Sequence, residues 1–274
     1  MLILQFGCSD APILAAPGAG ASVTCYLPLA EALGSDAHII GLQPRGLDGL
    51  MVPHSSVEAA AARFIQDVRG LGAKRVYRLV GHSFGGWIVF EAARRLVEMG
   101  CAIASVILLD TEPPSRPEDL PGKYGRTVAI RKLVRSIERT LGRDLQIDCA
   151  GLARLAPVQQ LKVLAKTLRI QQVLPRHAAD ETVQHLLRVF ASNLNTLYRP
   201  QAPLRGVVHL LRPTEERDGA DNEEDVISAQ EARRRWQEHV SVLQVHSVPG
   251  NHMTMLKKPH IDAIATIIRN AWEM

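Results

Sequence analysis

The stretch "RLVGHSFGGWIVFEAARRL", residues 78–96, joins two different hydrophobic patterns at a single serine. The residues before the serine are apolar and β-branched, which is typical of a buried strand, whereas those after it repeat their apolar side chains at the period of a helix. A chain that turns directly from strand to helix strains the corner residue, and glycines at 81, 85 and 86 let the two backbones pass closely. We therefore expect Ser83 to project its hydroxyl above the end of a sheet.

Short apolar runs alternate with helical patterns on both sides of this corner. The strand-like runs are "PILAAP" (12–17), "AHIIGLQ" (37–43), "RVYRLVG" (75–81), "AIASVILLD" (102–110), "GVVHLLRP" (206–213) and "VLQVHSVPG" (242–250). Helical patterns cover 25–33, 57–70, the segment after Ser83, a region around Trp236, and 260–272. This alternation predicts an α/β fold with a mostly parallel, twisted sheet flanked by helices.

The pattern changes after residue 110. The Pro-rich stretch "TEPPSRPEDLPGKYG" (111–125) breaks regular structure, and helical segments follow to about residue 195 without a convincing strand. The chain has 274 residues with 46% hydrophobic content, which fits one large domain better than two. We therefore predict a single domain over 1–274 with a helical insertion at about 113–195.

Composition argues against several other classes of protein. A net charge of +4 with 22% charged and 4% aromatic residues gives little support to nucleic-acid binding. Cys8, Cys25, Cys101 and Cys149 form no CxxC pair, so we expect buried free thiols rather than a metal site or a disulfide framework. Because no basic residue precedes Arg45 and no apolar run could span a bilayer, we expect no signal peptide, no membrane association and a cytoplasmic location.

A serine hydroxyl becomes an effective nucleophile when a histidine takes its proton and an acid orients that histidine. Function in parallel sheets lies at the carboxyl ends of the strands, which narrows the choice among ten histidines. His252 follows the last strand-like run, and Asp110 ends "SVILLD". A strand-end aspartate often only caps a turn. The order Ser83, Asp110, His252 within one α/β pattern nevertheless favours a catalytic triad.

The acid has a rival position later in the chain. In many hydrolases of this architecture it follows a later strand, which here places Glu215, Glu216 and Asp218 in the polar loop after "GVVHLLRP". For the oxyanion of acyl transfer, the residue after the nucleophile and an early strand-to-helix loop supply N–H donors. Phe84 is the first donor, and Gly18 in "APGAGAS" (16–22) is the second.

Six segments together resemble the α/β-hydrolase thioesterases of nonribosomal peptide synthetases and polyketide synthases. They are "APGAGASVTCYLPLAEAL" (16–33), "IIGLQPRGLDG" (39–49), "GHSFGGWIVFEAARRL" (81–96), "SVILLDTEPP" (105–114), "YRPQAPLRGVVHLLRP" (198–213) and "VPGNHMTMLKKPHI" (248–261). The chain departs from the family in one place, since many members open the first loop with His-Pro where this one has Ala16-Pro17.

The resemblance implies a function for the same residues. Ser83 is the nucleophile, Asp110 the acid, His252 the base, and Gly18 and Phe84 the oxyanion donors, with a helical lid over the site. The enzyme has no cofactor of its own. Its acyl, peptidyl or polyketide chain arrives on the phosphopantetheine arm of a carrier protein, moves to the serine as an ester, and leaves by attack of water or of an internal nucleophile.

Two other functions are compatible with the residues: a free-standing serine esterase or lipase acting on soluble esters, and a non-catalytic binding module with the hydrolase fold.

One further feature concerns the partner. In "AIRKLVRSIERTLGR" (129–143), five basic residues fall on one side of a helix, opposite an apolar side. We expect this basic stripe to face outward, either as ordinary solvated surface or as a docking face for an acidic carrier protein. Its members are Arg131, Lys132, Arg135, Arg139 and Arg143.

Overall fold

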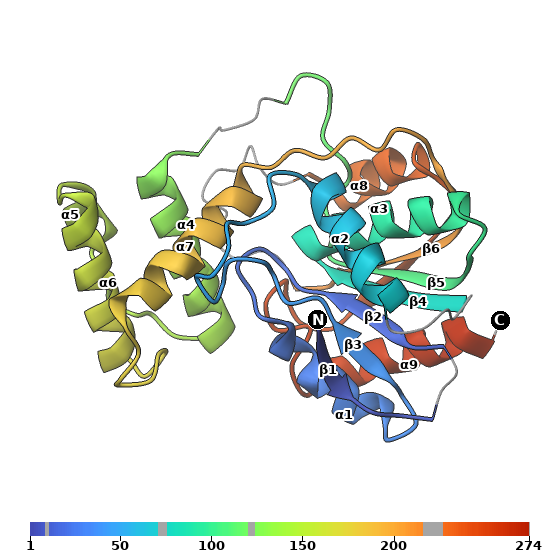
Figure 1. Ribbon diagram of the computed structural model, residues 1–274, viewed down its shortest axis with the longest axis horizontal. Coiled ribbons are helices and arrows are strands. Elements are labelled where there is room, and N and C mark those ends of the chain that lie inside the picture. The colour runs from blue at the N-terminus through green and yellow to red at the C-terminus, as the bar shows by residue number, and fades with distance from the viewer. Residues whose placement is uncertain (9–10, 71–75, 120–123, 216–226, 274) are drawn as a thin grey trace.

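The computed structural model describes residues 1–8, 11–70, 76–119, 124–215 and 227–273. Its centre is a seven-stranded sheet with the order β1-β3-β2-β4-β5-β6-β7, in which only β1 runs antiparallel to its neighbour (Figure 1). The strands are β1 (Leu2–Gln5), β2 (Ile13–Ala16), β3 (Ile39–Gly41), β4 (Val76–His82), β5 (Ala102–Leu109), β6 (Leu204–Pro213) and β7 (Val240–Val248).

Helices cover both faces of this sheet (Figure 1). One face packs against α2 (Val57–Gly70), α3 (Phe84–Glu98) and α8 (Ala229–Gln237), and the other against α1 (Leu27–Leu33) and α9 (Ile261–Glu273). Neighbouring residues of β4 show the division, because Leu79 belongs to the first core and Val80 to the second. Burial on both faces explains why the central strands have continuous apolar sequences rather than alternating ones.

A separate group of helices lies to one side of the sheet (Figure 1). It comprises α4 (Arg126–Leu141), α5 (Cys149–Ala153), α6 (Pro157–Ile170) and α7 (Asp180–Leu194), and we call it the α4–α7 layer. The layer has its own hydrophobic core, in which Leu133 and Val134 of α4 join Leu164 of α6 and Leu187 of α7. Its position in the chain matches the helical segments expected from the sequence.

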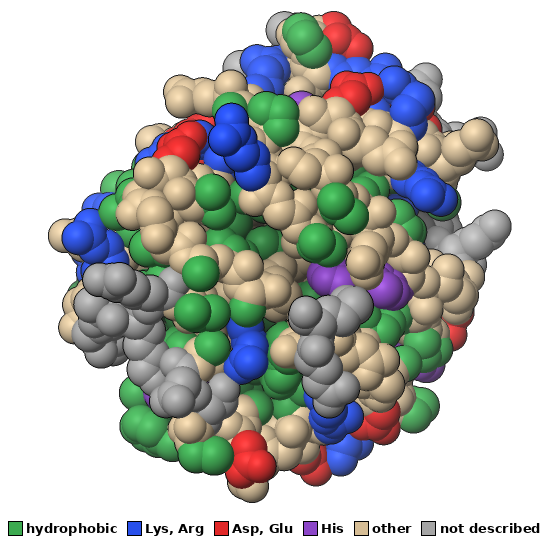
Figure 2. Space-filling model, turned by 90° about the vertical axis from the view of Figure 1, so that its right-hand side faces the viewer, with side chains coloured by type: hydrophobic (Ala, Val, Ile, Leu, Met, Phe, Trp, Pro, Cys, Tyr) green, Lys and Arg blue, Asp and Glu red, His purple; other side chains and the backbone are tan. Residues whose placement is uncertain are grey.

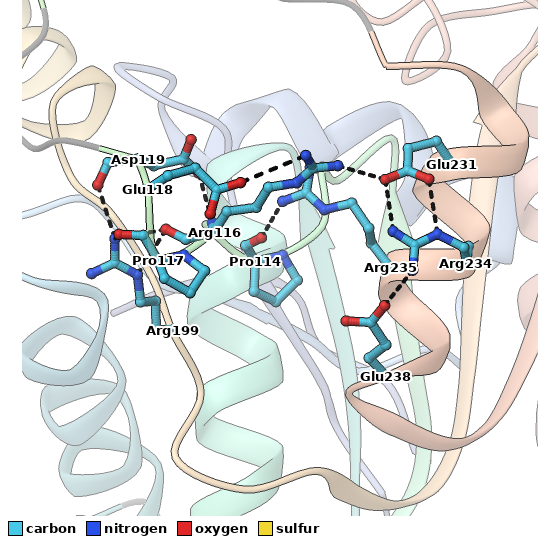
Figure 3. Close-up of polar contacts among 10 residues, drawn as sticks. All are labelled: Pro114, Arg116, Pro117, Glu118, Asp119, Arg199, Glu231, Arg234, Arg235 and Glu238. Carbon is cyan, nitrogen blue, oxygen red and sulfur yellow. Dashed lines mark hydrogen bonds and ion pairs between the residues drawn. The ribbon is translucent and has the colours of Figure 1, made fainter.

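The two segments that connect the α4–α7 layer to the sheet lie side by side (Figure 3). The guanidinium of Arg199, on the segment that leaves the layer, donates hydrogen bonds to the backbone carbonyls of Arg116, Pro117 and Asp119 on the segment that enters it. Ser115 N–H also donates to the carbonyl of Tyr198 at 2.8 Å. The entering and leaving segments are therefore joined to each other before the layer begins.

Several expectations need correction. Strand β1 was not predicted, because it is a short edge strand whose side chains are exposed or half-buried and show little pattern. The first helix begins at Leu27 rather than near residue 25, since Val23–Tyr26 form a 3₁₀ turn and a proline stands at the start of α1. Cys8 is exposed and the other three cysteines are half-buried, so the prediction of buried thiols is wrong for Cys8 and only partly met by the others.

The basic stripe on α4 is also less uniform than predicted. Arg131 is exposed, but Lys132, Arg135 and Arg139 are half-buried. Lys132 places its ammonium 5.0 Å from the centroid of the Tyr124 ring. Because α4 packs against both α5 and α7, part of its polar face meets protein rather than water.

The surface gives few further pointers to function. On the face shown in Figure 2, hydrophobic side chains are scattered among polar ones, and many charged side chains lie towards its edges. Within the described ranges, no helix combines the length and the apolar composition that a bilayer crossing requires.

Candidate active site

Ser83 stands at the corner between β4 and α3 with φ 51° and ψ −123°. A positive φ is strained for a residue with a side chain, and strain of this kind is typical of functional sites. The neighbouring glycines make the corner possible. A Cβ on Gly85 would collide with the carbonyl of Ala16, and one on Gly86 would collide with the side chain of Thr111. The strained strand-to-helix corner predicted from the sequence is therefore present.

Asp110 and His252 meet although 142 positions separate them. Asp110 directly follows β5 with φ 43°, and its Oδ2 lies 2.6 Å from Nδ1 of His252. The carboxylate side chain is 1% exposed and the imidazole 23% exposed. Because a carboxylate accepts hydrogen bonds, Nδ1 carries the proton and Nε2 is left as the basic nitrogen.

His82 links the loop that carries His252 to the serine corner. Its Nε2 lies 2.9 Å from the backbone oxygen of His252, and the two imidazole rings are 4.7 Å apart between centroids. His82 directly precedes Ser83, so this contact places the ring of His252 against the residue next to the serine. A histidine before the serine was visible in the sequence, but its partner on a distant loop was not.

The two expected oxyanion donors lie next to the serine. Phe84 is the first residue of α3, so its N–H belongs to the first turn, whose amides have no acceptor within the helix. Gly18 lies so close to the corner that a Cβ placed on it would be 3.3 Å from Cβ of Ser83 and 3.0 Å from Nδ1 of His82. A glycine at this position lets the early loop approach the nucleophile.

Arg212 is the member of the site that the sequence did not indicate. It lies near the end of β6, beside Asp110, and its Nη1 is 2.9 Å from Oδ1 of that aspartate and 3.5 Å from Oε1 of Glu112. One oxygen of the Asp110 carboxylate thus faces His252 and the other faces a guanidinium. The only hint in the sequence was a charged residue ending the buried run "VVHLL".

The rival acids of the later loop are placed differently. Glu215 is exposed, and its backbone N–H donates to the carbonyl of Gly250 at 3.1 Å. Glu216 and Asp218 lie outside the described residues. The observed contact of His252 with Asp110 therefore favours Asp110 as the acid.

Other reactive groups in the described chain differ from Ser83. Burial raises the pKa of the Cys25 thiol to about 12, which keeps it protonated near neutral pH and unsuited to nucleophilic attack. Over the described ranges, no group of three or more His, Cys, Asp or Glu side chains is arranged to hold a metal ion.

A family model of the thioesterase domain matches residues 11–271. The chain belongs to the thioesterase-domain family. Among its relatives, the chondramide synthase of Chondromyces crocatus is 27% identical over 270 residues, which cover 94% of this chain and 6% of the synthase. The aspulvinone E synthetase of Aspergillus terreus is 24% identical over 272 residues, which cover 93% of this chain and 27% of the synthetase. This thioesterase domain thus spans a small part of the length of these relatives.

Solved thioesterases have the same architecture. A structure of the Vlm2 thioesterase domain with a bound dodecadepsipeptide aligns with a TM-score of 0.67 and 21% identity, covering 98% of this chain and 96% of that one. The RedJ thioesterase from the prodiginine pathway of Streptomyces coelicolor aligns with a TM-score of 0.64 and 18% identity, covering 96% and 86%. The predicted α/β-hydrolase fold and the resemblance to synthase thioesterases are confirmed.

Proposed function

We propose that this thioesterase domain releases an acyl, peptidyl or polyketide chain from the phosphopantetheine thioester of a carrier protein, through an ester on Ser83. The observation that carries the proposal is the 2.6 Å contact between Asp110 and His252 beside a strained serine at the end of β4. Membership of the thioesterase family and its relatives among peptide and metabolite synthetases support the choice of a thioester over a soluble ester.

In the first half-reaction, Nε2 of His252 takes the proton of the Ser83 hydroxyl while the oxygen attacks the thioester carbonyl. Asp110 holds the imidazole in the tautomer that leaves Nε2 basic, and its charge stabilises the imidazolium that forms. The N–H groups of Phe84 and Gly18 face the negative oxygen of the tetrahedral intermediate. When the intermediate collapses, the C–S bond breaks and the pantetheine sulfur receives the proton from His252.

In the second half-reaction, the same histidine takes a proton from the attacking group, which is water for hydrolysis or a hydroxyl or amine of the chain itself for macrocyclisation. The new bond forms at the ester carbonyl, and the Ser83 oxygen leaves with the proton from His252. Exclusion of water favours the internal nucleophile. The balance between the two outcomes then depends on how far the α4–α7 layer covers the ester.

We assign the α4–α7 layer the role of the lid. Contacts between the layer and the loop of the base support this assignment: the hydroxyl of Ser136 lies 3.8 Å from the sulfur of Met253, and the Lys257 ammonium donates to the carbonyl of Thr140. On the other side of the layer, Ser192 donates to the carbonyl of His54 at 3.3 Å. The layer thus contacts both the loop that carries His252 and the segment that carries His54.

The test compares the chain with its Ser83→Ala variant on an acyl-pantetheine thioester and on an aryl ester of the same acyl group. We expect the thioester to be the better substrate, and we expect Ser83→Ala to lose both turnover and labelling by a fluorophosphonate. Ser241→Ala is the matched control, because this exposed serine lies at the start of β7. Labelling that persists in Ser83→Ala refutes the assignment of Ser83 as the nucleophile. A preference for the aryl ester indicates a free-standing esterase. Labelling of the unsubstituted chain without turnover of either substrate indicates a binding module.

A further inference from the structure

A pocket of about 500 Å³, counted with its open mouth, lies beside the serine corner. Its lining includes Phe84, one of the two expected oxyanion donors, and Pro17, which directly precedes the other donor, Gly18. Residues 42–45, 53–54 and 56 form part of the wall, and Val189 and Asn193 of α7 contribute to it from the α4–α7 layer. The position, between the corner and the layer, is one that a chain esterified to Ser83 could reach.

The lining of this pocket contains a cation and no carboxylate. None of the described residues that form it is Asp or Glu, whereas Arg45 contributes a guanidinium. Its Nε is buried and has no hydrogen-bond partner, and no ion pair joins Arg45 to another residue of the described ranges. A buried donor or charge without a partner costs free energy, and an anion that enters the pocket recovers that cost.

His54, on the same wall, is affected by this charge. Burial lowers the pKa of His54, and the positive charges of Arg45 and then Arg63 lower it further. Asp67 acts in the opposite direction, but it is paired with Arg63 at 2.7 Å. His54 is therefore neutral near pH 7, which leaves Arg45 as the charged side chain of the lining.

Other polar side chains of the wall already have partners. The amide oxygen of Gln43 accepts hydrogen bonds from the hydroxyl of Ser22 at 3.2 Å and from the N–H of Val23 at 3.1 Å. The hydroxyl of Ser56 accepts from the N–H of Ala59 at 3.1 Å in the first turn of α2. These bonds hold the wall in place, whereas the guanidinium of Arg45 remains for a ligand.

We infer that this pocket binds a carboxylate carried by the acyl chain, with Arg45 as its counter-charge. The inference rests on the proposed function, because it assigns the pocket to the chain attached to Ser83. A carboxylate matches the planar guanidinium, which donates parallel N–H bonds to both of its oxygens. The substrate class is therefore a thioester whose acyl chain carries a second, free carboxyl group.

The test uses glutaryl, adipyl and pimelyl thioesters of N-acetylcysteamine and the ω-methyl ester of each as a neutral match. We expect kcat/KM for the best acid to exceed that for its methyl ester by about tenfold to a hundredfold, which is the contribution of a hydrogen-bonded charge. Arg45→Met brings this ratio close to one, and Arg45→Glu transfers the preference to an ω-amino chain. Arg63→Met is the matched control, and it keeps the ratio because Arg63 lies outside the lining.

An acid-to-ester ratio near one in the unsubstituted chain, or a ratio that Arg45→Met leaves unchanged, overturns the inference. A separate measurement distinguishes this failure from failure of the proposed function. Calorimetry of free adipate with the Ser83→Ala variant needs no catalysis. Binding that Arg45→Met abolishes supports the pocket even if no thioester is turned over, whereas binding that survives Arg45→Met overturns it.

Discussion

Replacing Asp110 by asparagine tests the site through the contact on each side of this residue. One carboxylate oxygen lies 2.9 Å from the Arg212 guanidinium and the other 2.6 Å from Nδ1 of His252. An asparagine here directs its carbonyl oxygen at the guanidinium, since that group only donates. Its amino group then donates to Nδ1 of His252, which moves the imidazole proton to Nε2.

The expected loss follows from this change of tautomer. With Nε2 protonated, His252 cannot accept the proton of Ser83, and the corresponding change in serine proteases lowers kcat by about 10⁴. We expect Asp110→Asn to lower kcat by about 10³ to 10⁴, which corresponds to about 4 to 5.5 kcal/mol of activation free energy. The assay is hydrolysis of a hexanoyl thioester, followed through the released thiol.

A second substitution, at Arg212, provides a control in which activity is expected to rise rather than fall. In the double variant Asp110→Asn with Arg212→Met, no guanidinium fixes the asparagine, so the amide is free to turn its oxygen to His252. We expect the double variant to recover about tenfold in kcat over Asp110→Asn alone, a coupling of about 1.4 kcal/mol between neighbouring positions. Near-normal activity of Asp110→Asn together with collapse of Glu215→Gln would refute the reasoning and move the acid to the later loop.

Three further predictions concern stability and the partner. Burial lowers the pKa of both His209 and His246. Because the unfolded histidines then bind protons at a higher pH than the folded ones, the free energy of unfolding falls as the pH drops below about 7. Urea unfolding at pH 7.5 and 5.5 shows a smaller fall in this free energy for His246→Gln than for the unsubstituted chain. Tyr198→Phe removes a buried 2.9 Å hydrogen bond to a carboxylate of α3 and lowers the unfolding free energy by about 1 to 3 kcal/mol, and an unchanged urea midpoint contradicts this. Arg131→Glu on the exposed side of α4 lowers kcat/KM for a carrier-bound chain at low salt but not for a small thioester, whereas equal losses on both assign the residue to the pocket.

The sheet could be predicted because its central strands carry a strong signal. Residues 79–81 of β4 and 106–109 of β5 are apolar and buried, and the helices between the strands repeat at helical period. α2 was expected with the boundaries that the structure shows, 57–70. The signal was absent in β1, which is short and half-exposed. It was incomplete for α4, where the pattern of charges could not show which side chains meet the other helices.

The site was predictable where its residues end strands. Ser83 and Asp110 come directly after β4 and β5, which are neighbours in the sheet, so the topology alone brings them together. Arg212 and Arg45 were not predicted as parts of the site. The role of Arg212 depends on its contact with Asp110, and that of Arg45 on a pocket, and segments distant in the sequence form both. A charged residue beside an apolar run indicates that an opposite charge or a ligand compensates it, but the sequence does not identify this partner.

The joined connectors of the α4–α7 layer have a consequence for protein engineering. Ser115 and Tyr198 are hydrogen-bonded to each other, so the segments that enter and leave the α4–α7 layer are adjacent where they join the rest of the domain. A chimera with crossover points at these two residues exchanges the whole layer as one unit. The strands that position Ser83 and Asp110 stay unchanged.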